Sequence, residues 1–301
     1  MKQIVKLDSI DAYHRMYGLV TRHPLVSVID LKQARIPVNH LTMEYGLYAI
    51  YLKNNANCSI RYGRKQYDYQ AGTIVSFSPG QVIDVDMEVT EFRPDVVGLL
   101  FHPDLIFGTP LAEKIASFRF FDYSESESLH LSDAERAQFL ECLARIDAEL
   151  NSPVDDHSAP ILSMHIQVLL EYLHRFYDRQ FTTRHKVNSE VLTNFERHLK
   201  AYYEGDLHEK GLPGVAYFAD KAHLSTGYFS DLIRKETGSS PKDLIALHLV
   251  QTAKQRLVAT RDNVNSIAYG LGFEYPAHFT RMFKRITGLT PREYRETASA
   301  G

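Results

Sequence analysis

The 301-residue chain has no tryptophan and only two cysteines, Cys58 and Cys142. Because the two cysteines are far apart in the sequence, we expect free thiols in a reducing compartment rather than a disulfide. No run of about 18 apolar residues is present, which argues against a membrane-spanning helix. The first residues also lack the apolar core and cleavage site of a secretory signal peptide. The sequence therefore predicts a cytoplasmic protein with no membrane segment.

Sequence patterns of the common enzyme classes are missing too. The chain has no His-x-His pair, no Cys-x-x-Cys pair and no glycine-rich phosphate loop. His40 and His102 are isolated, and a lone histidine more often has a structural role than a metal-binding one. We therefore expect no enzyme activity, no catalytic residue, no metal site and no cofactor.

Charge is divided unevenly along the chain. The net charge is −3, from 34 basic and 37 acidic residues. Residues 211–301 hold 12 basic and 8 acidic residues, a net charge of +4, which leaves 22 basic and 29 acidic residues, −7, in the rest. A basic end on an acidic remainder suits a nucleic-acid-binding module joined to a different kind of domain.

The N-terminal half shows a strand pattern. Short runs rich in Val, Ile, Tyr and Phe occupy residues 26–29, 48–52, 73–77 and 96–101, with turn residues between them. Several short strands at regular spacing predict a β-sandwich or a closed barrel.

A small barrel can enclose one ligand. We expect an effector pocket inside it, and the candidate effector-binding residues are Tyr48, Arg61, Tyr67, Tyr69 and Phe77. Two alternatives stay open. The aromatic side chains could form a plain packed core, and Arg61 could lie on the outer face beside Arg64 and Lys65.

Two helices are expected in the middle of the chain, over residues 132–150 and 160–181. Ser132 and Glu135 have the spacing of a capping box at the start of the first helix. The second helix has a broad apolar face, and surplus apolar surface is often covered by a partner. We therefore predict a homodimer formed through these two helices; alternatively, they only close the barrel. The boundaries follow as a domain over residues 1–181, a linker over 182–189 and a second domain over 190–301.

Two segments near the C-terminus repeat one pattern. Phe229 and Phe279, Gly238 and Gly288, and Pro241 and Pro291 are each 50 residues apart. A repeat of this kind predicts one supersecondary unit built twice.

Each copy is expected to be a helix-turn-helix. In the first copy, Ser225 is placed to cap a helix that ends at Gly238, and in the second copy Pro276 begins a helix that ends at Gly288. A long helix that starts at Ser240 joins the two copies. The stripes expected to be buried are Phe229, Leu232 and Ile233 in the first copy, and Phe279, Met282, Phe283 and Ile286 in the second.

Residues from about 190 to 297 resemble the DNA-binding domain of the AraC/XylS family of bacterial transcription regulators. The second copy carries most of the signature: Ile267, Ala268, Gly272, Phe273, Phe279, Arg281, Phe283, Lys284, Gly288, Thr290, Pro291, Tyr294 and Arg295. The first copy matches at Leu224, Ser225, Tyr228, Phe229, Lys235, Gly238 and Pro241. The N-terminal half resembles the family's cupin-like sensor domain more loosely, including Phe101-His102-Pro103-Asp104.

The resemblance implies an α+β chain of two domains, with a cupin-like barrel followed by helices and an all-α domain with two helix-turn-helix motifs. It implies a regulator, an activator in our prediction, that binds double-stranded promoter DNA and contacts RNA polymerase. The residues expected to contact DNA are Thr226, Gly227, Ser230, Asp231, Arg234, Lys235, Ala277, His278, Thr280, Arg281, Lys284 and Arg285.

Within that set, Arg281 is expected to contact a base edge, and Lys284 and Arg285 to contact phosphates. The first copy offers Gly227, Ser230 and Asp231 at matching positions, so it is expected to contribute less. Two other functions stay open: a cupin-barrel metalloenzyme with a DNA-binding tail, and a regulator whose barrel binds a protein instead of a small-molecule effector.

Overall fold

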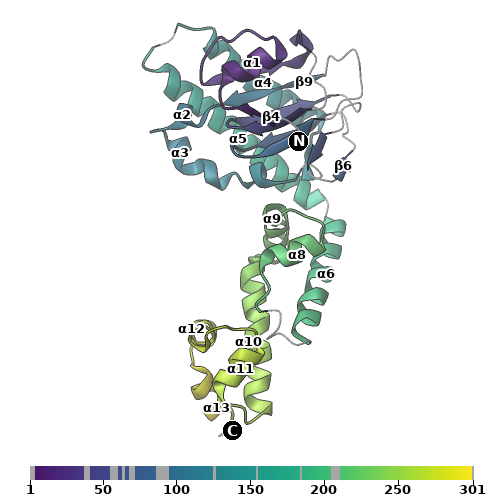
Figure 1. The fold of residues 1–301 in the computed structure, drawn as a ribbon, viewed down its shortest axis with the longest axis vertical. Helices are drawn as coiled ribbons and strands as arrows, with labels where there is room; N and C mark the ends of the chain where they lie inside the picture. Colours follow the sequence, from purple (N-terminus) through teal and green to yellow (C-terminus); the bar gives the residue numbers. More distant parts are fainter. Residues whose placement is uncertain are drawn as a thin grey trace. The chain divides into compact units, whose positions relative to one another are not determined.

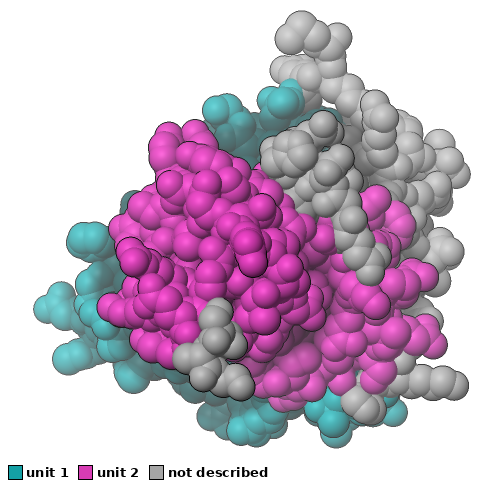
Figure 2. All heavy atoms as spheres, turned by 90° about the horizontal axis from the view of Figure 1, so that it is seen from below, with its two compact units in different colours: residues 1–183 teal, residues 184–301 magenta. Residues whose placement is uncertain are grey.

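The computed structural model describes residues 4–36, 41–54, 60–62, 65–67, 72–85, 95–124, 127–153, 155–183, 185–204 and 211–299. They belong to two compact units, unit 1 (residues 1–183) and unit 2 (residues 184–301), shown as ribbons in Figure 1 and as teal and magenta spheres in Figure 2. Residues 182–189, expected to be a linker, are helical on both sides of Arg184, because one helix ends at Thr183 and the next begins at His185.

Unit 1 contains two five-stranded sheets. The first has the order β1 (Ile4–Leu7), β3 (Leu41–Tyr45), β8 (Val82–Val85), β5 (Ile60–Tyr62) and β6 (Lys65–Tyr67), with β1 parallel to β3 and the other pairs antiparallel. The second is antiparallel throughout, with the order β10 (Leu129–His130), β7 (Thr73–Phe77), β4 (Tyr48–Lys53), β9 (Val96–Phe101) and β2 (Val26–Asp30). The described strands thus form two separate sheets and do not close into one barrel.

A hydrophobic core lies between the two sheets. It contains Met43 and Ile83 from the first sheet and Ala49, Tyr51 and Phe77 from the second, together with side chains of the N-terminal helix. Because the two sheets bury their facing sides against each other, the arrangement is a sandwich.

Strand register decides which side chains of β4 and β7 enter that core. Ala49 lies opposite Phe77 and Tyr51 opposite Val75, so these side chains share the inner face. Neighbouring residues of a strand point to opposite faces, which directs Tyr48 away from the core. Its ring instead stacks on Phe101 at 4.9 Å and lies 5.0 Å from Phe121.

Helices cover the outside of the second sheet (Figure 1). The two long ones are α4 (Asp133–Leu150), which packs on β2, and α5 (Ser158–Thr183), which packs on α4 and β10. Ser132 and Glu135 form the expected capping box at the start of α4. The shorter helices are α1 (Ile10–Tyr17), η1 (Leu31–Gln33), α2 (Pro103–Ile106), α3 (Pro110–Lys114), η2 (Ile115–Ser117) and η3 (Arg119–Asp122).

Unit 2 is helical over its described residues. It contains α6 (His185–Glu204), α8 (Val215–Lys221), α9 (Thr226–Thr237), α10 (Pro241–Ala259), α11 (Val264–Gly270), α12 (Pro276–Thr287) and α13 (Pro291–Ser299). The helix α10 packs against α6 and α9 as well as against α11, α12 and α13, and it joins the two halves of the unit. Its 19 residues make a rod of about 28 Å, as the sequence predicts.

Candidate nucleic-acid interface

The first helix-turn-helix consists of α8 and α9. Phe229 of α9 is fully buried, and Phe195 of α6 lies between Phe229 and Phe218, at ring distances of 5.5 Å and 5.0 Å. Leu232 and Ile233 complete the buried face of α9. The stripe expected from the sequence therefore packs against both α6 and α8.

The second helix-turn-helix consists of α11 and α12. Phe279 and Phe283 of α12 are fully buried, with ring centroids 5.7 Å apart. Phe273 packs on Phe279 at 5.4 Å and Tyr294 packs on Phe283 at 5.6 Å. Met282, also expected in this stripe, is only half-buried, so the two phenylalanines anchor the helix.

The repeat extends to hydrogen bonds at the helix ends. Gly238 and Gly288 end α9 and α12 in the left-handed conformation, with φ of 74° and 81°. One residue earlier, the hydroxyls of Thr237 and Thr287 donate to the carbonyls of Ile233 and Phe283, each at 2.8 Å. Both recognition helices thus end in the same geometry.

The turns of the two motifs differ in length. The amide of Leu224 donates to Ala219, and the amide of Phe273 donates to Ala268, so these equivalent pairs are 49 residues apart rather than 50. The second turn has one additional residue before its recognition helix. Ser225 caps α9 by accepting from the Tyr228 amide at 3.2 Å, whereas Tyr275, in the same place before α12, gives no side-chain cap.

The outward face of α12 is strongly basic. Arg281, Lys284 and Arg285 are all exposed, as are Ala277 and His278. Neither Arg281 nor Arg285 makes an ion pair or hydrogen bond through its side chain with any residue that the structure describes. Their charges are therefore available to an external anion.

Thr280 of α12 is half-buried, and the ring of His278 lies 5.5 Å from that of Tyr275. Tyr275 itself is 56% exposed. The sequence alone does not indicate Tyr275 as a site residue. The additional residue in the second turn places this tyrosine directly before α12, and the 50-residue repeat does not show that residue.

The outward face of α9 is different. Arg234 pairs with Asp231 at 3.5 Å, which partly neutralises both charges. Thr226, Arg234 and Lys235 are exposed and Gly227 is half-buried. Our expectation that Ser230 faces outward is wrong, because its side chain is buried and its hydroxyl donates to the carbonyl of Thr226 at 2.7 Å.

Two arginines outside the recognition helices hold the second motif to α10. Arg256, near the end of α10, donates to the carbonyl of Gly270 at 2.8 Å, where α11 ends. Arg295 of α13 donates to the carbonyl of Leu257 at 2.9 Å. Cations at helix C-terminal carbonyls are stabilising, so these contacts fix α11 and α13 relative to α10. In the sequence, Arg295 stands out only as part of the family signature, and no pattern indicates the role of Arg256.

Two of the five residues expected to line an effector pocket do not lie together. Tyr48 and Phe77 lie on opposite faces of one sheet, so they cannot line a single cavity. Arg61 and Tyr67 lie in β5 and β6, where the structure describes the backbone alone, and Tyr69 lies outside the described residues. The sequence did not separate Tyr48 from Phe77, because a shift of one residue in a strand moves a side chain to the other face.

The described histidines and acidic residues do not gather into a metal-binding group of three or more. The ring of His102 accepts the amide of Asp104 at 3.1 Å and so caps α2. His40 lies outside the described residues. Over the described part of the chain, no helix is both long enough and apolar enough to cross a membrane.

Residues 218–297 match the family model described as "Helix-turn-helix domain". The chain is 34% identical over 83 residues to the uncharacterized HTH-type transcriptional regulator YobQ of Bacillus subtilis, covering 28% of this chain and 34% of YobQ. It is 33% identical over 75 residues to the raffinose operon transcriptional regulatory protein RafR of Pediococcus pentosaceus, covering 25% of this chain and 27% of RafR.

A solved structure of a Chromobacterium violaceum transcriptional regulator, described as an AraC-type DNA-binding domain-containing protein, is 21% identical. The match covers 36% of the present chain and 93% of the Chromobacterium violaceum chain, with a TM-score of 0.33. The chain spans about a third or less of the length of the two curated relatives. Residues 218–297 are thus a helix-turn-helix domain, and the resemblance to the AraC/XylS family of transcription regulators that the repeat indicates is confirmed for this region.

Proposed function

We propose that the chain is a sequence-specific, DNA-binding transcription regulator that binds promoter DNA mainly through α12. The observation that carries this proposal is the outward face of α12, where Arg281, Lys284 and Arg285 are exposed opposite the buried Phe279 and Phe283. An amphipathic helix with a basic outward face fits the major groove of duplex DNA.

The position of each cation suggests its role. Arg281 lies in the middle of α12, and arginine can donate two hydrogen bonds to one guanine. Lys284 and Arg285 lie nearer the end of the helix, where contacts to phosphates add affinity without sequence information. Arg281 is therefore proposed to determine specificity, and the other two to position the helix.

The first motif is proposed to contribute less to binding. Asp231 is the acidic residue of its outward face, and its pairing with Arg234 reduces the attraction of α9 for phosphate. Thr226 and Lys235 remain exposed and can contact the backbone of the duplex. A rod of about 28 Å between the motifs is compatible with successive major grooves, which are about 34 Å apart.

Unit 1 is proposed to sense an effector and to form the homodimer, with activation through contact with RNA polymerase. Its two facing sheets suit a cupin-like sensor, although the described strands are not closed into a barrel. On α5, Met164 is 59% and Val168 is 49% exposed, one turn apart. Burial of these side chains against a second copy would remove apolar surface from water and so favours the dimer.

The experiment that tests this function starts by sequencing genomic fragments that the full chain retains. Arg281→Ala is then compared with the unchanged protein on the preferred fragment and on fragments with single base changes. We expect a loss of about 1–3 kcal/mol that is confined to one base position, with relaxed preference there. Arg292→Ala is the matched control, because Arg292 is an exposed arginine of α13 that pairs with Glu296. Unchanged affinity and preference in Arg281→Ala would contradict the proposal.

A further inference from the structure

The space between the two sheets of unit 1 is occupied by tyrosines. Tyr13 of α1, Tyr45 of β3 and Tyr51 of β4 are each at most 5% exposed. The hydroxyls of Tyr45 and Tyr51 lie 3.1 Å apart and form a hydrogen bond with each other. A ligand site for unit 1 has to be sought outside this packed centre.

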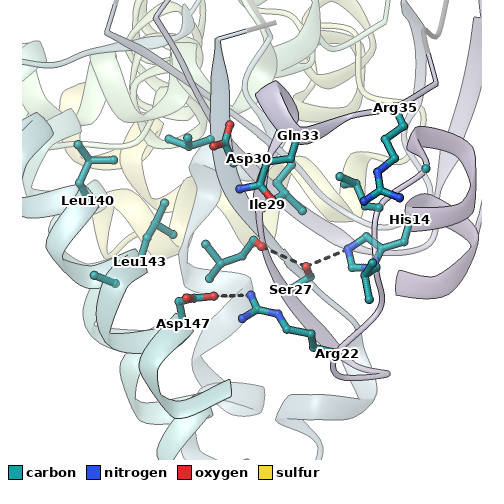
Figure 3. A pocket seen from close by; sticks show the side chains of 16 residues that line it. His14, Arg22, Ser27, Ile29, Asp30, Gln33, Arg35, Leu140, Leu143 and Asp147 are labelled. Carbon is teal, nitrogen blue, oxygen red and sulfur yellow. Dashed lines mark hydrogen bonds and ion pairs between the residues drawn. The ribbon is translucent and has the colours of Figure 1, made fainter. Parts of the chain in front are cut away.

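A cavity of about 620 Å³ lies between β2 and α4, outside this packed centre (Figure 3). It is bounded by the end of α1, the segment 18–35 and the face of α4 that carries Leu140, Leu143 and Asp147. Its volume is in the usual range for pockets that hold small organic ligands.

Most polar side chains of this cavity already have partners. His14 is buried, and its ring nitrogens lie 3.0 Å from the hydroxyl of Thr21 and 2.9 Å from that of Ser27. Arg22 is ion-paired with Asp147 at the rim. These groups shape the cavity and are not free to bind a ligand.

Two polar side chains of the lining remain unused. Gln33 and Arg35 both border the cavity, and neither side chain makes a hydrogen bond or ion pair with another residue of the described ranges. Both can donate hydrogen bonds, and the planar guanidinium fork matches the two oxygens of a carboxylate.

The opposite wall is apolar. Leu140, Leu143 and Ala144 of α4 face the cavity together with Leu19 and Val28. A ligand held there would need an apolar body as well as an anionic head. Among the described residues that border the cavity there is no Phe, Tyr or Trp on which a sugar ring could stack.

We propose that this cavity binds a small monocarboxylate with an apolar body, its carboxylate held by Arg35 and Gln33 and its body against α4. Asp30 also lines the cavity and has no cationic partner among the described residues, although it accepts the amide of Lys32 at 3.0 Å. Its negative charge disfavours a second carboxylate on the ligand, which is why a monocarboxylate fits better than a dicarboxylate.

A bound carboxylate would add contacts to α4, which packs on α5, the helix proposed to pair in the dimer. Control of DNA binding by the ligand rests on the proposed function, whereas ligand binding itself does not. Binding is therefore measured on the full chain without DNA, and DNA binding is measured separately.

The test uses isothermal titration calorimetry with 4-methylpentanoate, 3-phenylpropanoate and 1-naphthylacetate, each compared with its primary amide. We expect at least one carboxylate to bind about tenfold or more tightly than its amide. Arg35→Gln should weaken that carboxylate to the level of the amide, and Ala144→Phe should weaken both by filling the apolar side. Arg15→Gln is the control, since Arg15 pairs with Asp11 and does not line the cavity.

The proposal is overturned if no carboxylate of the series binds at millimolar concentration, or if the amides bind equally well. It is also overturned if Arg35→Gln, with an unchanged melting temperature, binds the carboxylate like the unchanged protein. Failure of the chain to bind any DNA would refute the proposed function but would not affect the proposal of a ligand site, which is tested without DNA.

Discussion

Arg234 and Lys284 occupy equivalent positions of the two recognition helices, 50 residues apart, but differ in their surroundings. Arg234 pairs with Asp231 at 3.5 Å. Lys284 is close enough to Glu293 to help lower the pKa of that carboxyl, which hydrogen bonds from Thr290 lower most, but it makes no ion pair with a described residue. Replacement of each by glutamine therefore tests whether an internal partner decides the contribution of a cation to DNA binding.

The magnitude follows from counterion release. A full phosphate contact contributes about 0.9 to the slope of log affinity against log salt concentration. Lys284→Gln should lower the slope by that amount, so between about 50 and 200 mM salt the unchanged protein loses roughly 3.5-fold more affinity than the variant. For Arg234→Gln we expect less than about half of that change, because Asp231 already neutralises the guanidinium.

The assay is fluorescence anisotropy on one labelled promoter fragment, at four salt concentrations. Asp231→Asn is a useful companion, since it releases Arg234 and should strengthen binding at low salt. If Arg234→Gln flattens the slope as much as Lys284→Gln does, the ion pair does not matter and the reasoning is refuted.

Three further predictions concern stability and assembly. Phe229→Ala and Phe279→Ala each remove a fully buried ring and should each cost about 3–5 kcal/mol in denaturant unfolding; a cost below about 1 kcal/mol would contradict the packing. Burial lowers the pKa of His14, so near the ordinary histidine pKa of about 6.5 the unfolded chain binds a proton more readily than the folded chain does. The free energy of unfolding should therefore decrease as the pH is lowered from about 7.5 to 5.5. His14→Gln should lose less stability over that range, and an equal loss in both proteins would exclude His14 as a cause. If the proposed dimer forms through α5, Val168→Glu should convert it to a folded monomer in sedimentation velocity, with an unchanged far-ultraviolet circular dichroism spectrum, and a dimer that persists would place the interface elsewhere.

Local signals in the sequence predicted much of the fold. Ser225 and Ser240 begin helices and Gly238 ends one, as expected, because caps depend on the residues next to them. The strands around Tyr48 and Phe77 were also predicted, since strand composition is local.

Features that depend on distant partners were not predicted. The strand Ile4–Leu7 exists through parallel pairing with residues 41–45, which no local pattern indicates. The burial of Ser230 became visible only in the folded structure. The cavity beside Arg35 is bounded by α4, more than 100 residues further along the chain, so its lining is visible only in the folded structure.

The helix α10 belongs to the cores of both motifs, since it packs against α6 and α9 on one side of the repeat and α11, α12 and α13 on the other. Buried residues occur along its whole length, from Ile245 to Leu257. Deletion of either motif would leave part of this helix uncovered. The two motifs therefore share one central helix: substitutions on the outward faces can change base preference without disturbing it, whereas loss of either motif would expose apolar residues of α10 to water.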